Sequence, residues 1–184
     1  MSDYSFAIEV FKTFTPYVLA TVVYYFWHVQ KGKEVIASES KNVIMQLNEV
    51  SDLGSNIFGL IFEKVNHRNV DEKSLSKEEL KTLENALNSY EIKFKDVLNS
   101  LDFLEGAIND NNIKKIREMA FLCFYCALDE YHTKIIHLEL NEYKDNEDMV
   151  DQNVKLQNEI TEMKKMLYVY ALYKTNIVSR TLKL

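Results

Sequence analysis

The chain has 184 residues, of which 47% are hydrophobic and 27% charged, the composition of one folded domain rather than of a disordered or fibrous protein. Only 4 Gly and 1 Pro are present, too few for the tight corners of a sandwich or barrel, so the sequence predicts an all-α fold. The formal net charge of −6 argues against general DNA binding, because phosphate recognition depends on a surplus of Lys and Arg. Two Cys residues cannot make a disulfide framework and fit a reducing compartment.

The first predicted element is a helix over residues 1–31 with the length of a membrane span. No residue between Lys12 and Lys31 carries a formal charge, and a helix over these 18 residues is about 27 Å long, close to the hydrocarbon thickness. The aromatic cluster at 24–27 precedes Lys31, as an interfacial belt precedes a headgroup anchor. We expect a single-pass transmembrane helix; the alternative is an amphipathic helix packed on a soluble bundle.

Two further features of this segment concern its orientation and its proline. More Lys residues follow the segment than precede it, which places the remainder of the chain, residues 32–184, in the cytoplasm. Pro16 fits either as the first residue of a helix capped by Thr15 or as a kink in a helix that begins near Asp3.

A polar stripe runs along this predicted helix. At 100° per residue, its members fall within about a third of the helix circumference. They are Glu9, Thr13, Tyr17, Thr21, Tyr24 and His28. Such a stripe is costly against lipid and should face other helices or a water-filled lumen. Because the chain has one such helix, the sequence predicts a homo-oligomer in the lipid bilayer, with these six residues lining a pore.

Residues 32–184 are predicted to form a bundle of long antiparallel helices. Apolar residues at steps of three and four over 35–65 indicate one helix, or two that meet near Gly54. Ser76 and Glu79 form a capping box that starts the next helix. That helix carries a faultless seam suited to antiparallel packing or to a coiled coil. The seam is Leu80, Leu83, Leu87, Tyr90, Phe94, Val97, Leu101 and Leu104, and it continues to Ile108.

Two more helices complete the predicted bundle. The turn at 109–112 supplies an N-cap for a helix from Ile113 to about Tyr143. This helix contains the apolar run 119–128, MAFLCFYCAL, and we expect it to be the central helix because it is apolar on all sides. The last helix begins around the acidic stretch 145–151 and continues past Ile177 towards a basic C-terminus.

Few residues suggest chemistry. Cys123 and Cys126 form a CxxC inside the apolar run, where packing is the favoured role, and neither a redox pair nor a metal site is expected. His132 and His137 lie in a titratable cluster with Asp129, Glu130 and Glu139, but a carboxylate-x-x-His motif occurs once, whereas a di-metal bundle needs two. Lys114, Lys115 and Arg117 form a basic patch near a helix N-terminus, equally explained as a solvated turn. No Walker, GxSxG, HExxH or Rossmann motif is present, and no cofactor is expected.

In size and predicted architecture, an N-terminal membrane helix followed by a helical bundle, the whole chain resembles the small HEPN-like membrane accessory proteins of type VI-B CRISPR systems. The resemblance implies a pore in the bacterial inner membrane that supports antiphage defence, and an RNA-guided nuclease or its RNA as partner. The HEPN ribonuclease motif, Arg followed after four to six residues by His, does not occur in this sequence.

Two other functions remain open at this stage. The chain can be a helical interaction module or scaffold whose seam binds a partner helix. It can also be a divergent HEPN-type ribonuclease, for which His132 and His137 are the catalytic candidates, since they have the four-residue spacing with His in place of Arg.

Overall fold

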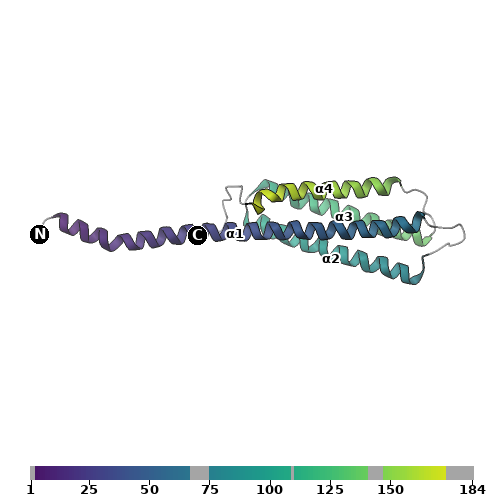
Figure 1. Cartoon of the computed structure of the whole chain (residues 1–184), viewed down its shortest axis with the longest axis horizontal. Coiled ribbons are helices and arrows are strands. Elements are labelled where there is room, and N and C mark those ends of the chain that lie inside the picture. Colours follow the sequence, from purple (N-terminus) through teal and green to yellow (C-terminus); the bar gives the residue numbers. More distant parts are fainter. Residues whose placement is uncertain (1–2, 67–74, 109, 141–146, 173–184) are drawn as a thin grey trace.

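The computed structural model describes residues 3–66, 75–108, 110–140 and 147–172. Four helices follow one another: α1 (Asp3–Asn66), α2 (Lys77–Ala107), α3 (Asn111–Leu140) and α4 (Glu147–Ala171). The later part of α1 and the other three helices form an antiparallel bundle, from which the first part of α1 projects alone (Figure 1). The all-α bundle is therefore confirmed.

Helix α1 joins two elements that the sequence analysis treats separately. It has 64 residues and runs through the predicted boundary at residue 31 without a break. Pro16 lies inside the helix, so its role as a kink in a helix that begins at Asp3 is confirmed. The purple part of α1 bends (Figure 1), as expected where a proline removes a backbone N–H and its ring crowds a carbonyl of the preceding turn. Over the described residues, no helix is long and apolar enough to cross a bilayer.

The start of α2 is fixed by the predicted capping box. Glu79 N donates to Ser76 Oγ at 3.3 Å, and Ser76 N donates to the Glu79 carboxylate at 2.9 Å. Lys64, near the end of α1, bonds to the same carboxylate. The Lys64 ammonium and then the Ser76 N–H lower the pKa of Glu79 to about 2. This cluster ties the start of α2 to the end of α1.

The seam of α2 faces the core of the bundle. Leu83, Leu87, Tyr90, Phe94, Val97, Leu101 and Leu104 are buried, and Leu80 packs at the edge of the core. Helix α1 packs along α2 and α4, and α3 lies diagonally across from α1 against the same two neighbours. The chain's own helices thus cover the surface that the interaction-module hypothesis assigned to a partner helix.

Gly54 lies where side chains of three other helices come close to the backbone of α1. A Cβ on Gly54 would lie 3.2 Å from Leu156 Cδ2, 3.2 Å from Tyr131 Oη and 3.4 Å from Tyr90 Cε2. The Tyr131 hydroxyl donates to the Gly54 carbonyl at 3.1 Å. The rings of Tyr90 and Tyr131 meet edge to face, with centroids 5.7 Å apart. Because Gly54 has no side chain, side chains from α2, α3 and α4 can reach the backbone of α1 at this position.

The expectation that α3 is a central helix is wrong. A helix in a four-helix bundle contacts two neighbours and buries one stripe, and on α3 that stripe includes Ile116, Ala120 and Phe124. The outward positions of the same apolar run stay exposed, among them Leu122 (62%) and Tyr125 (57%). The run is apolar all round, but the fold buries only one side of it.

The start of α3 and the end of α4 are joined through Asp110. Asp110 caps α3, because its Oδ1 accepts from Asn112 N at 2.8 Å. Its other oxygen accepts from the Tyr170 hydroxyl, at the end of α4, at 2.5 Å. Burial and then this bond raise the pKa of Tyr170. The predicted N-cap turn is confirmed for Asp110; Asn109, the segment 141–146 and the predicted helical residues from 173 onward lie outside the described residues.

Candidate functional site

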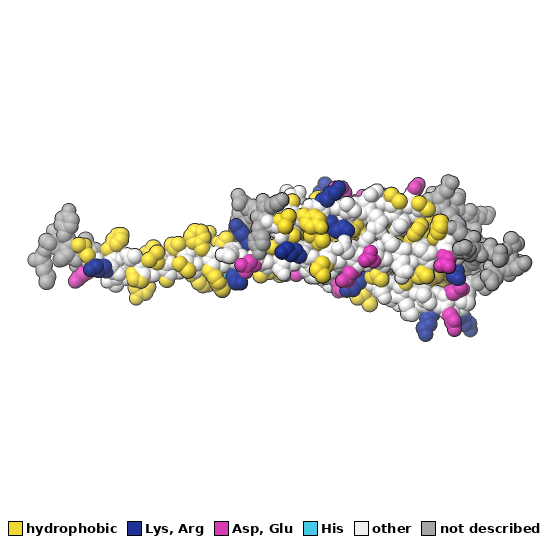
Figure 2. Space-filling model, in the orientation of Figure 1, with side chains coloured by type: hydrophobic (Ala, Val, Ile, Leu, Met, Phe, Trp, Pro, Cys, Tyr) yellow, Lys and Arg dark blue, Asp and Glu magenta, His cyan; other side chains and the backbone are white. Residues whose placement is uncertain are grey.

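The most unusual surface of the molecule is the projecting part of α1, residues 8–29, called the arm below. Every side chain from Ile8 to His28 is exposed, because no other described helix lies beside it. Figure 2 shows hydrophobic side chains along its length. The most exposed is Phe11, at 77%, and Trp27 is still 54% exposed. Water-soluble monomers rarely leave so continuous an apolar surface uncovered, which makes the arm the candidate binding surface of the described residues.

The polar stripe of the arm makes its own hydrogen bonds. Thr13 donates to the Glu9 carbonyl at 2.9 Å, and Thr21 donates to the Tyr17 carbonyl at 2.8 Å. A hydroxyl satisfied by the preceding turn costs less to remove from water than a free one. Thr15, beside the proline and outside the stripe, bonds the Phe11 carbonyl in the same way.

Tyr24 and His28 form a second local pair in the stripe. The His28 Nε2 and the Tyr24 hydroxyl are 2.7 Å apart, and the ring centroids are separated by 4.5 Å in an edge-to-face arrangement. The Trp27 ring also meets His28, at 5.3 Å. Just beyond, Lys31 pairs with Glu34 at 2.8 Å. An aromatic cluster thus ends at an ion pair, where the arm approaches the bundle.

The structure keeps the predicted pore-lining residues on one continuous helix. The described hydrogen bonds join them in pairs along the helix: Glu9 with Thr13, Tyr17 with Thr21, and Tyr24 with His28. Whether they face a lumen depends on other copies of the chain, so their lining role stays a prediction.

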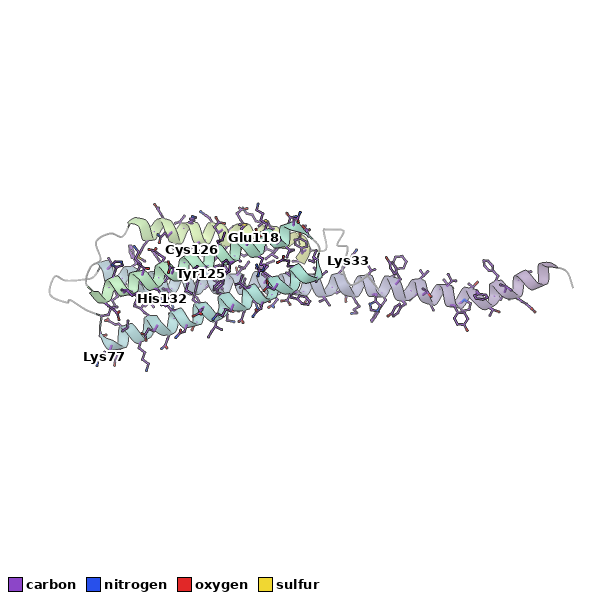
Figure 3. All side chains as sticks on the ribbon, turned by 180° about the vertical axis from the view of Figure 1, so that it is seen from behind. Lys33, Lys77, Glu118, Tyr125, Cys126 and His132 are labelled. Atoms are coloured by element: carbon purple, nitrogen blue, oxygen red, sulfur yellow. The ribbon has the colours of Figure 1, made fainter. Side chains whose placement is uncertain are left out.

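The titratable cluster on α3 does not come together as a site. Asp129 and His132 are both exposed, and Glu130 pairs with Lys134 at 3.2 Å. His132 lies on the side of α3 that faces α2 (Figure 3), near Glu91, whose pKa the hydrogen bond from Lys95 lowers. Within the described ranges, no group of three His, Cys, Asp or Glu side chains is arranged to hold a metal ion.

The basic patch at the start of α3 is largely paired with acids. Arg117 bonds to Asp102 and lies 3.4 Å from Glu105, both on α2, and Asp102 raises its pKa. Lys114 lies 3.9 Å from Glu118. These contacts favour the interpretation as a solvated, ion-paired helix turn over an anion site.

The two cysteines differ in environment. Cys123 is half-buried, and burial, followed by the charge of Glu159, raises its pKa to about 12. Cys126 is exposed, so the expectation that both are buried packing residues is wrong for Cys126. The cause is the outward face of α3 described above.

Both thiols line a groove between α3 and α4, called the α3–α4 groove below. Figure 3 places Cys126 on the side of α3 nearer to α4. This groove was not predicted from the sequence. The sequence feature that could have indicated it is the apolar run on α3. Because the run is apolar on all sides, it carries more apolar surface than one packing stripe buries.

No protein-family model, curated protein or solved structure matches the chain.

Proposed function

We propose that the chain is a membrane-associated oligomer whose arms gather in the bilayer of the bacterial inner membrane and form a polar-lined pore. The observation that carries this proposal is the arm itself, a continuous helix with eleven exposed large apolar side chains from Ile8 to Trp27 besides the members of one polar stripe. Lipid would cover the apolar face, and the stripes of neighbouring copies would face one another or a lumen. The bundle, residues 32–184, would stay in the cytoplasm.

The proposed pore requires the arms of several copies of the chain to assemble. A lone helix with Glu9, His28 and several hydroxyls would be poorly stabilised by lipid alone. In an oligomer, each arm would expose only its apolar face to lipid. The hydrogen bonds from Thr13 and Thr21 to the preceding turn lower the cost of bringing the stripe into a low-dielectric surrounding.

The first test is the behaviour of the full-length protein beside a variant that lacks residues 1–30. We expect the full-length chain to need detergent for extraction and to run as a ring-sized oligomer, whereas the shortened chain loses both properties. Purification of the full-length chain as a monomer without detergent would refute the proposal. A detergent-independent oligomer that depends on residues 1–30 would instead identify the arm as a protein-interaction module.

The second test concerns the lumen. Thr21→Leu and His28→Leu should reduce dye leakage from vesicles of phosphatidylethanolamine and phosphatidylglycerol while leaving the oligomer size unchanged. Val23→Leu, an exposed apolar position on the same turns, is the matched control and should leak as the natural chain does. Equal leakage from all three variants would contradict lumen lining.

The biological setting follows from the resemblance alone: the pore would strengthen antiphage defence beside an RNA-guided nuclease or its RNA. Phage plaque counts in cells that carry the nuclease, with and without this chain, test that role. A ribonuclease mechanism predicts that replacing His132 and His137 together by Ala abolishes protection. The pore proposal predicts full protection from that variant and loss of protection from His28→Leu.

A further inference from the structure

The charged residues of the arm are unevenly placed around the helix. From Ile8 to Val29, the residues with a formal charge at pH 7 are Glu9 and Lys12. Glu9 begins the polar stripe, whereas Lys12 lies about 125° from the middle of the stripe at 100° per residue. In the proposed pore, Lys12 would therefore face away from the lumen, and its long side chain would reach the headgroup layer. The formal charge of the stripe is then that of the Glu9 carboxylate.

The other end of the stripe meets an ion pair. Lys31, the next charged residue along the chain, bonds to Glu34 at 2.8 Å. The hydrogen bond and the charge of Lys31 hold the pKa of Glu34 below its ordinary value, so the two opposite charges offset each other near neutral pH. Lys33 lies about 170° from the middle of the stripe. The Glu9 carboxylates, at the mouth away from the bundle, are therefore left to set the sign of the potential in the lumen.

The threonine hydroxyls of the stripe offer acceptors rather than donors. A hydroxyl has one O–H to donate and two lone pairs to accept with. Thr13 and Thr21 each donate the O–H to a carbonyl of the preceding turn, at 2.9 and 2.8 Å. Both side chains are exposed, so their lone pairs are available to a solute. Oxygen lone pairs coordinate cations and repel anions.

We propose that the pore formed by the arms admits small inorganic cations in preference to anions, with a ring of Glu9 carboxylates at one mouth and the oxygens of Thr13 and Thr21 along the wall. The carboxylates raise the local concentration of cations, and the threonine oxygens replace part of the water around a passing cation. An anion would be repelled by the ring and would receive no hydroxyl proton from either threonine. This inference rests on the proposed pore and adds the charge of the solute that it conducts.

The test is the ratio of K⁺ to Cl⁻ permeability of the full-length protein in planar bilayers. Phosphatidylethanolamine and phosphatidylcholine form the bilayer, because neither carries a net charge that would itself attract cations. The reversal potential under a KCl gradient gives the ratio. We expect K⁺ to be favoured about tenfold or more when the concentrated side holds about 0.1 M KCl. The ratio should fall at about 1 M KCl, because the Debye length shortens from about 10 Å to about 3 Å and screens the carboxylate ring.

Variants separate the two contributions. Glu9→Gln removes the charge at constant shape and should lower the ratio about threefold or more, in the low-salt bilayer above all. Thr13→Val together with Thr21→Val replaces each hydroxyl by a methyl group of similar size, and should lower the ratio equally at both salt concentrations. Lys12→Gln is the matched control, since it removes a charge three residues from Glu9 but outside the stripe, and should change the ratio by less than about twofold.

The outcomes distinguish this inference from the pore on which it rests. Channels that do not favour K⁺ over Cl⁻, or a Glu9→Gln variant as selective as the natural chain, overturn the cation preference and leave the pore standing. A Lys12→Gln variant that changes the ratio as much as Glu9→Gln overturns the placement of these two charges, and the inference with it. If the natural chain forms no channels, the proposed pore and its cation preference are both refuted.

Discussion

The contrast between two glycines of α1 gives a quantitative test of the bundle. Gly54 and Gly59 lie in the same helix, five residues apart, but a Cβ at Gly59 meets nothing within 4 Å, whereas at Gly54 it meets three side chains at 3.2 to 3.4 Å. Glycine in a helix interior is about 0.5 to 1 kcal/mol less favourable than alanine. Gly59→Ala should therefore stabilise the protein by up to about 1 kcal/mol.

At Gly54 the packing reverses this gain. Two Cβ contacts at 3.2 Å already require Leu156 and Tyr131 to move, and the further methyl groups of valine would enlarge the displacement. Overpacking a filled core costs about 1 to 3 kcal/mol, so Gly54→Val should be destabilising by about that amount. Gly59→Val is the matched control, since it adds the same side chain in open space.

Thermal unfolding followed by far-UV circular dichroism measures the difference. For a chain of this size, about 1 kcal/mol corresponds to about 2 to 4 °C in Tm. We expect Tm to rise by that amount in Gly59→Ala and to fall by about 2 to 12 °C in Gly54→Val. If the two valine variants have the same Tm, the helices do not approach one another at Gly54 as described.

Three other predictions concern single contacts. Tyr170→Phe removes the hydroxyl that donates to the charged Asp110 and should lower the stability by about 1.5 to 3 kcal/mol in urea unfolding, with unchanged helix content as the control. The pKa of Glu79 is lowered from 4.5 to about 2, so its ionised carboxylate stabilises the fold above pH 4.5, and this stability is lost as the pH falls towards about 2. Glu79→Gln should therefore flatten the fall of Tm in that pH window. An unchanged dependence of Tm on pH would contradict the role of this cap. Iodoacetamide at pH 8 should alkylate the exposed Cys126 well before Cys123, whose pKa is raised to about 12, and the reverse order would show that α3 presents another face.

Periodicity predicted the bundle accurately where one stripe of a helix is apolar. On α2, seven predicted seam residues are buried, and the capping box sits where Ser76 and Glu79 indicated. Periodicity did not predict the packing of α3, because a run that is apolar on all sides does not indicate which side of the helix is buried. The exposure of Leu122 and Cys126 follows from the number of neighbours that α3 has.

The two candidate surfaces also differ in whether the sequence alone could predict them. The stripe from Glu9 to His28 was visible in the sequence, because a spacing of three and four residues on a helix needs no tertiary contact to be recognised. The groove was not visible, because its walls come from α1, α3 and α4 and its volume depends on how those helices pack.

By itself, the sequence determined that the chain is helical, where α2 and α3 are capped, and that the first 31 residues carry an apolar face beside a polar stripe, because these properties depend on neighbours within a few turns. Only the tertiary structure decided that α1 runs unbroken from the arm into the bundle and which side of α3 is outward. It also decided that Asn153, Glu159 and the two cysteines share one groove. Those properties arise from packing between segments far apart in the chain, which a local pattern does not encode.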